Sequence, residues 1–130
     1  MKAFFRALCG LLLIPASAPA LAAEHTKDSL ETVKQRVTDK EAVLIDVREQ
    51  SEWDTGHLSD AVFLPLSRLK QGADKKDLES LSKDKICYIH CASGKRVLPA
   101  ADALKKLGYD ARPLKAGYQQ LVEAGFSKAN

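Results

Sequence analysis

The sequence predicts a three-layer α/β domain, with a central parallel sheet of about five short strands and helices on both of its faces. Two observations support this fold class. Short and almost unbroken apolar runs alternate along the chain with segments whose apolar residues recur at helical spacing, and this alternation is typical of a parallel sheet. The runs do not alternate apolar with polar residues, so both faces of the sheet should be covered.

The first 22 residues read as an export signal and not as part of that domain. Lys2 and Arg6 precede an apolar stretch at 7–14, and small residues at 20 and 22 form a cleavage site,. The apolar stretch is too short to cross a bilayer as a helix. We therefore expect cleavage after Ala22 and a periplasmic location.

Residues 23–130 are expected to form one monomeric domain, since about 108 residues suit a single core. The chain carries 20 lysines and arginines against 17 aspartates and glutamates. Removal of the two cations of the export signal leaves 18 basic residues, and therefore a formal charge of +1. A near-neutral surface argues against nucleic acid or an anionic membrane as a partner.

The first elements are a helix, a strand and a polar connection. Asp28 is the expected N-cap of the helix, because Glu31 follows three residues later and apolar side chains then recur at helical spacing,. The apolar run at 42–47 is the first strand. Residues 48–56 are polar and acidic, which predicts a short helical turn or a loop, with Trp53 in the core.

Two further strands follow. Residues 61–64 form a short strand that Pro65 ends, and residues 86–89 form the third strand,. Between them, residues 66–81 predict one broken helix or two short ones, with Gly72 at the break,.

The last third of the chain predicts two helices and one more strand. Proline is tolerated only in the first turn of a helix, so the first of these helices must begin between Lys95 and Pro99,. Its apolar spacing extends to Gly108, a typical stop. A fourth strand is expected at 111–114 and a final helix at 118–124.

Of the three cysteines, Cys9 would leave with the export signal. Cys87 and Cys91 are four residues apart, which along a strand separates their Cα atoms by about 13 Å. A disulfide allows no more than roughly 7 Å. We expect Cys87 to be a small buried hydrophobe. A free Cys91 in an oxidising compartment is then either buried or chemically active.

The loop at 91–96 follows the third strand directly. In a parallel sheet this end of a strand binds ligands, because the loop and the next helix present unpaired amides there. These amides, with Lys95 and Arg96, would favour the thiolate of Cys91, and Gly94 would let the loop curl with its amides inward. This arrangement predicts a nucleophilic cysteine in an anion-binding loop. The alternative is a packed cysteine beside two solvated cations.

Two segments together resemble the rhodanese (thiosulfate sulfurtransferase) family. That family pairs an Asp-Val-Arg-x-x-x-Glu-(aromatic)-x-x-Gly-His-(aliphatic) segment with a later Cys-x-x-Gly-x-Arg loop. The first motif stands here at 46–58 and the second at 91–96. The resemblance covers about residues 28–126 and implies a rhodanese-like domain. An exported domain of this size is similar to the phage-shock-protein-E type of the family.

The resemblance implies a persulfide relay without a metal or an organic cofactor. The Cys91 thiolate would attack the outer sulfur of thiosulfate and release sulfite. The persulfide would then pass its sulfur to cyanide or to another thiol. The loop would bind the anionic donor and the persulfide through Ala92, Ser93, Gly94, Lys95 and Arg96.

Four residues of the first motif are expected to support the structure. Asp46 would accept hydrogen bonds from nearby amides, and Arg48 would pair with Glu52. His57 could be a general base, but a thiolate held by amides has little need of one, so we expect a hydrogen-bonded loop histidine. His90 should point to the face of the sheet opposite the nucleophile, as a packed or partly exposed ring.

Other functions stay open. Cysteine phosphatases of similar fold use Cys-x5-Arg to make room for phosphate, whereas this chain has the shorter Cys-x4-Arg, which suits a single sulfur atom. A binding module or sulfur carrier with little turnover, or a thiol–disulfide exchange protein, would use the same loop. A metal site is not expected, because strand alternation would spread its possible ligands over both faces: Cys87, Cys91, His57 and His90.

Overall fold

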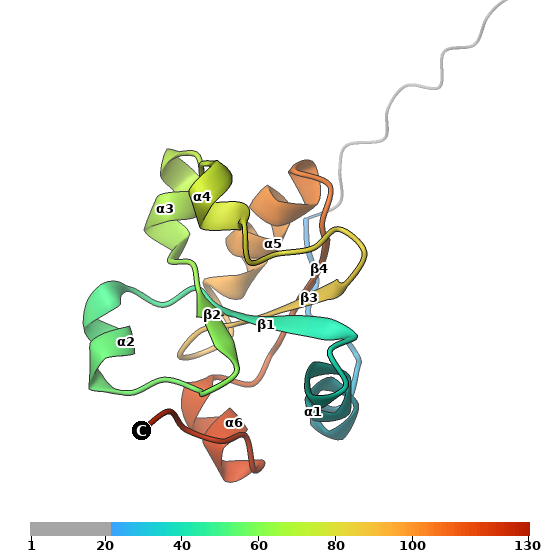
Figure 1. The fold of residues 1–130 in the computed structure, drawn as a ribbon, viewed down its shortest axis with the longest axis vertical. Coiled ribbons are helices and arrows are strands. Elements are labelled where there is room, and N and C mark those ends of the chain that lie inside the picture. The colour runs from blue at the N-terminus through green and yellow to red at the C-terminus, as the bar shows by residue number, and fades with distance from the viewer. Residues whose placement is uncertain (1–21) are drawn as a thin grey trace, which may run out of the picture.

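A four-stranded parallel sheet forms the centre of the computed structural model, which describes residues 22–130 (Figure 1). The strands lie in the order β2-β1-β3-β4, and each neighbouring pair is parallel. Their bounds are β1 Ala42–Asp46, β2 Ala61–Phe63, β3 Ile86–His90 and β4 Asp110–Pro113. Each apolar run identified above is a strand, but the described residues contain four strands and not about five. The predicted export signal lies outside the described residues, apart from Ala22.

Helices cover both faces of the sheet, which confirms the three-layer α/β fold (Figure 1). One face packs against α3 (Leu66–Gln71), α4 (Lys75–Leu78) and α5 (Val97–Lys106). The other face packs against α1 (Leu30–Thr38) and α6 (Tyr118–Glu123). The remaining helix, α2 (Gln50–Thr55), connects β1 to β2 and buries none of its residues. Among the described residues, no helix has the length and apolar character that a membrane span requires.

The alternation of side chains along β3 assigns its residues to the two layers. Cys87 and Ile89 belong to the core cluster under α3 and α5, whereas Tyr88 belongs to the cluster under α1 and α6. Successive side chains of a strand point to opposite faces. Cys91 continues the first series and packs beneath α5.

The first helix is capped one residue later than predicted. The Ser29 hydroxyl accepts a hydrogen bond from the Thr32 amide at 3.2 Å, so Ser29 is the N-cap. Asp28 faces the sheet instead, where its Oδ2 accepts hydrogen bonds from three donors: Tyr88, Arg36 and Arg112. Two guanidinium groups and a phenol hold this carboxylate away from the helix N-terminus.

Most of the other boundaries follow the sequence. Helix α5 begins at Val97, which leaves Pro99 in its first turn, and residues 66–81 form two short helices and not one. The prediction for Trp53 was wrong, because this ring is half-buried and stacks on the His57 ring with 3.6 Å between centroids. Helix α2 lies outside both core clusters, and its tryptophan packs locally.

Candidate functional site

The loop between β3 and α5 curls around the sulfur of Cys91. The Gly94 amide donates a hydrogen bond to the Cys91 Sγ at 3.2 Å. Gly94 has a φ of +78°, a conformation that glycine adopts without the steric cost of a side chain,. The loop that holds the sulfur leads directly into the N-terminus of the ten-residue helix α5, and the amides and the dipole of a helix N-terminus favour a negative charge.

Several loop amides are open donors. Within residues 22–130, the amides of Ala92, Ser93 and Lys95 donate to no backbone or side-chain acceptor. Cys91 itself has no exposed surface, whereas Ala92, Ser93 and Lys95 are exposed. The loop thus combines a buried sulfur with amides that can donate hydrogen bonds to an anion.

A second segment, residues 115–118, packs directly against the loop. The Tyr118 amide donates to the Cys91 carbonyl at 2.8 Å. A Cβ atom at Gly94 would overlap the Lys115 carbonyl, and one at Gly117 would overlap the Ala92 carbonyl. Both glycines are needed because two stretches of backbone approach each other closely here.

The N-terminal segment also reaches the loop, which sequence reasoning missed. The Nε2 atom of His25 lies 2.6 Å from the Gly94 carbonyl oxygen. His25 stands in an irregular stretch before α1, so neither periodicity nor a motif indicates this contact.

An ion pair joins the two sequence motifs. Arg96 donates two hydrogen bonds to the Glu52 carboxylate, at 2.6 and 2.8 Å. These bonds are the main cause that lowers the pKa of Glu52 to about 2. They also raise the pKa of Arg96 above its usual value, and the nearby Cys91 contributes in the same direction. Both terminal nitrogens of Arg96 therefore bind Glu52, and the part-exposed guanidinium lies near Cys91.

Lys95 is the exposed cation of this loop. Within residues 22–130 it takes part in no salt bridge, and its side chain is exposed. Its charge is therefore available to attract an anion to the loop.

The prediction that Arg48 pairs with Glu52 was wrong. Arg48 binds both oxygens of Asp46 at 2.8–3.1 Å and donates to the Gly56 carbonyl at 2.8 Å. Its guanidinium lies over the Tyr118 ring, 4.2 Å from the centroid. Arg48 precedes α2 and turns inward, whereas Glu52 lies in the first turn of α2 and reaches toward the loop. The expected bond from an amide to Asp46 is present, with the Arg48 amide as the donor at 2.9 Å.

The two histidines near the motifs differ in their surroundings. His57 Nδ1 lies 3.0 Å from the Trp53 carbonyl, so this ring is a hydrogen-bonded loop histidine as expected. His90 is fully buried, and neither ring nitrogen has a hydrogen-bond partner within residues 22–130. Its Nε2 lies 3.8 Å from Asp46 Oδ2. Burial lowers the pKa of His90, which keeps the ring neutral,.

Cys87 and Cys91 have different environments, although both are free and buried. Burial raises the pKa of the Cys87 thiol to about 11, so this thiol stays protonated at neutral pH. Cys87 is the small buried hydrophobe that was predicted. In the part of the chain that the structure describes, no group of three or more His, Cys, Asp or Glu side chains is placed to hold a metal ion.

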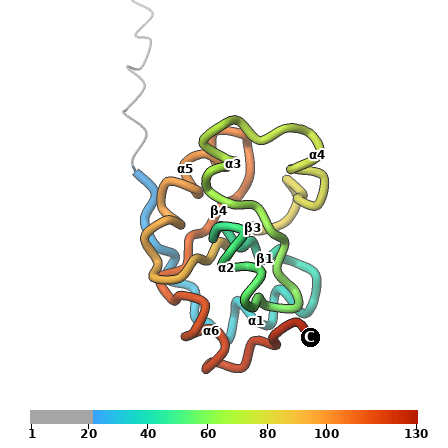
Figure 2. The backbone as a smooth tube through the Cα atoms, turned by 90° about the vertical axis from the view of Figure 1, so that its left-hand side faces the viewer, coloured from blue at the N-terminus to red at the C-terminus, as the bar shows by residue number. Residues whose placement is uncertain are grey.

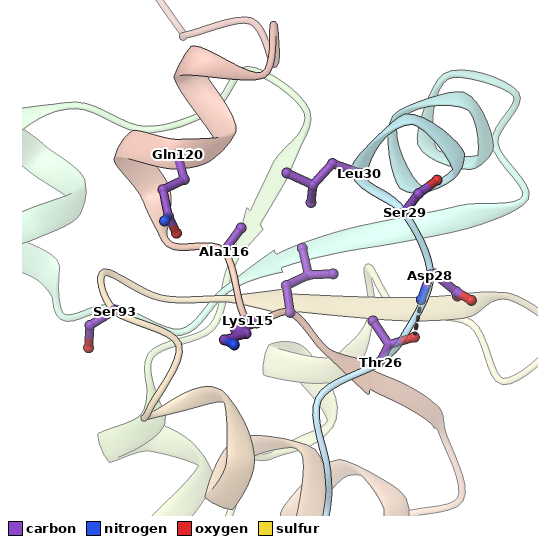
Figure 3. Close-up of a pocket in the computed structure, with 9 residues that line it drawn as sticks. Thr26, Asp28, Ser29, Leu30, Ser93, Lys115, Ala116 and Gln120 are labelled. Atoms are coloured by element: carbon purple, nitrogen blue, oxygen red, sulfur yellow. Dashed lines mark hydrogen bonds between the residues drawn. The ribbon is translucent and has the colours of Figure 1, made fainter.

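A cavity of about 530 Å³ adjoins the outer side of the loop. Figure 3 shows its lining, with Lys115 between the loop residue Ser93 and the residues that precede α1. The lining residues are Thr26, Asp28, Ser29, Leu30, Ser93, Leu114, Lys115, Ala116 and Gln120. Cys91 does not line this cavity, so a molecule bound there would touch the loop only through Ser93.

Comparison with known proteins places this arrangement in a family. The model of the rhodanese-like domain matches residues 29–124. The chain is 35% identical over 82 residues to the "Putative sulfur carrier protein YrkF" of Bacillus subtilis, a match that covers 62% of this chain and 42% of that protein. It is 34% identical over 85 residues to the "Putative thiosulfate sulfurtransferase, mitochondrial" of Schizosaccharomyces pombe, covering 58% and 59%. The chain thus spans less than two thirds of the length of either relative.

Solved structures show the same fold. The human single-domain sulfurtransferase TSTD1 superposes with a TM-score of 0.64 at 25% identity, over 74% of this chain and 94% of that one. A rhodanese-related protein from Thermoplasma volcanium superposes with a TM-score of 0.62 at 25% identity, over 77% and 93%. The rhodanese-like fold expected from the sequence is confirmed.

Proposed function

The chain belongs to the rhodanese-like domain family, and we propose that it is a sulfurtransferase that carries sulfane sulfur from thiosulfate to cyanide or a thiol as a persulfide on Cys91. The observation that carries this proposal is the 3.2 Å hydrogen bond from the Gly94 amide to the Cys91 sulfur. An amide that points at a sulfur stabilises the thiolate more than the thiol. We assign the remaining open amides of the loop as the hydrogen-bond donors to the second sulfur.

The reaction balances without an oxidant or a cofactor. The Cys91 thiolate attacks the outer sulfur of thiosulfate, so that a new S–S bond forms at Sγ. The bond from the outer sulfur to the sulfonate sulfur breaks, and its electron pair leaves with sulfite. The terminal persulfide sulfur keeps one negative charge, which the open amides of Ala92, Ser93 and Lys95 can stabilise. Attack by cyanide on that sulfur releases thiocyanate and returns the thiolate.

The burial of Cys91 limits the access of the sulfur donor to Sγ. Cys91 has no exposed surface, so the donor reaches it only when the loop opens. The exposed residues Ala92, Ser93 and Lys95 form the outer side of the loop, which is the side from which the donor approaches. The Lys95 cation attracts the thiosulfate dianion to this place.

A sulfur carrier is the second candidate, and the complete burial of Cys91 favours it. A buried persulfide is protected from adventitious thiols, and a docking partner protein could open the loop. The Bacillus subtilis relative bears the name of a sulfur carrier. For a carrier we expect slow loading by free thiosulfate and fast loading by a persulfidated partner.

We also propose export to the periplasm and membership of the phage-shock-protein-E type. The basic, apolar and small-residue regions of residues 1–22 support export,. Expression of the full chain followed by N-terminal sequencing of the periplasmic fraction should find Ala23 as the first residue. Recovery of the uncleaved chain from the cytoplasm would contradict this.

Intact-mass measurement tests the proposed chemistry. The protein is reduced, desalted and incubated with thiosulfate, and we expect a mass increase equal to one sulfur atom that cyanide removes. The Cys91→Ala variant should gain no mass, and the Cys87→Ala variant should gain the same mass as the wild type. A reduced wild-type protein that takes no sulfur from thiosulfate or from a persulfide donor would refute the assignment.

A further inference from the structure

The segment at 23–28, here called the strap, is fixed although it forms no helix or strand. Its first residue, Ala23, is buried, and the Ala23 backbone nitrogen, which becomes the terminal amine after the proposed cleavage, donates to Asp102 Oδ1 at 2.9 Å. The Thr26 amide donates to the Pro113 carbonyl at 2.8 Å. Figure 2 shows the strap running beside α5, and Figure 1 shows it beside β4. These two anchors hold the backbone on either side of His25.

His25 donates to the loop from this fixed position. Its Nε2 atom lies 2.6 Å from the carbonyl oxygen of Gly94. A carbonyl can only accept, so Nε2 must carry a hydrogen. The Gly94 backbone is buried, and a glycine with a positive φ has little conformational preference of its own. The contact therefore adds a restraint from the strap on the carbonyl side of a residue that has little conformational preference of its own.

The peptide unit between Gly94 and Lys95 links His25 to the anion-binding side of the loop. In a trans peptide the C=O and N–H bonds point in opposite directions, and the described residues contain no cis bond. When His25 holds the Gly94 carbonyl on the strap side, the Lys95 amide must point away from the strap. That amide is one of the open donors of the loop. A hydrogen bond to the carbonyl also polarises the unit and makes its N–H a stronger donor.

We propose that His25 is a positioning residue for the sulfur-carrying loop, which keeps the Lys95 amide directed at the charge that develops during persulfide formation. The inference rests on the proposed function, since it assigns a role within that reaction. It assigns no proton transfer to His25. Without the contact the peptide unit can rotate, and the reacting sulfur loses one oriented donor. Removal of a whole oriented donor in other enzymes lowers rates by about 10²–10³, so a donor that is merely released should cost about tenfold.

Three substitutions separate positioning from general support. His25→Gln places its amide nitrogen as many bonds from Cα as Nε2, whereas His25→Asn places it one bond nearer and out of reach. We expect His25→Gln to form the persulfide within about threefold of the wild-type rate, and His25→Asn and His25→Ala to be about tenfold slower. Lys27→Ala, an exposed position on the strap, should match the wild type.

The assay is the rate of mass gain from thiosulfate, recorded well below the melting temperature of each variant. A wild-type protein that gains no sulfur would contradict the proposed function itself. Equal rates for His25→Gln and His25→Asn, in a wild type that does gain sulfur, overturn the positioning role. A second measurement needs no turnover: the Lys95 amide proton in NMR spectra of the reduced protein should shift upfield in His25→Asn and not in His25→Gln. An unchanged Lys95 signal in both variants also overturns the proposal.

Discussion

Replacing Glu52 by glutamine should lower the free energy of unfolding by about 1 kcal/mol at neutral pH. The variant keeps the shape of the side chain but loses the charge that binds Arg96 at 2.6 and 2.8 Å. Pairing with Arg96 is the main cause that lowers the pKa of Glu52 from 4.5 to about 2. By linkage this difference is worth at most about 3.4 kcal/mol. The side chains of Arg96 and Glu52 are 31% and 34% exposed. Solvent screening therefore reduces the contribution of the pair to the free energy of unfolding to about 1 kcal/mol.

The dependence on pH has a definite sign. The pKa of Glu52 is lower in the folded protein than in the unfolded chain, so the stabilisation is fully present above pH 4.5,. It is lost as the pH falls through 4.5 toward 2, where the folded protein also takes up the proton. At about pH 3, less than half of it should remain. Wild type and Glu52→Gln should therefore differ most at neutral pH and converge in acid.

Urea denaturation across this pH range measures the effect, and Trp53 is a convenient probe because it is the one tryptophan in the chain and the neighbour of Glu52. Asp60→Asn is the matched control, because Asp60 is exposed and lies outside the salt bridges of the described residues. The control should follow the wild type at each pH. A difference between wild type and Glu52→Gln that stays constant from pH 7 to pH 2, or that is absent at pH 7, would refute the reasoning.

Three further predictions concern the surroundings of the loop. Gly117→Ala should lower the free energy of unfolding by about 2 kcal/mol and slow persulfide formation, because its Cβ would overlap the Ala92 carbonyl; urea midpoints equal to those of the wild type would contradict this. His90 has a pKa below 6.5 in the folded protein because of burial, so its contribution is present above pH 6.5 and is lost as the pH falls. His90→Leu should therefore flatten the decline of the melting temperature below pH 6.5, and an unchanged slope would count against the neutral buried ring. Iodoacetamide at neutral pH should label Cys91 slowly and leave Cys87 unlabelled in the folded protein, with both labelled in urea; peptide mapping that finds Cys87 labelled first would contradict the assignment, since burial raises the pKa of Cys87 to about 11.

Local patterns were enough to predict the layers and the course of the chain. The apolar runs at 42–47 and 86–89 are central strands of the sheet because few other structures bury a short and almost wholly apolar segment,. Pro99 limited the start of α5 to a few residues, and the structure has it at Val97. The curl of the loop followed from Gly94, whose φ is positive. These features depend on adjacent residues and on the spacing of apolar residues along the chain, and both can be read from a single sequence.

Side-chain partners were less predictable, because several candidates lie near one another in the chain. Arg48 and Glu52 are four residues apart, which suggested a pair. Arg48 instead binds Asp46 in the interior, and Glu52 binds Arg96, which is 44 residues away. The choice depends on which way each side chain leaves its backbone and on how α2 lies against the loop.

The sequence by itself determined that a cysteine would follow a buried parallel strand and precede a helix, because apolar periodicity, Pro99 and Gly94 act over a few residues,. Only the tertiary structure decided that this sulfur is buried, that Glu52 holds Arg96, and that His25 holds the Gly94 carbonyl from 69 residues away. Such contacts arise from the apposition of distant segments. Their geometry depends on distances of a few tenths of an ångström, which are set by the packing of the whole domain.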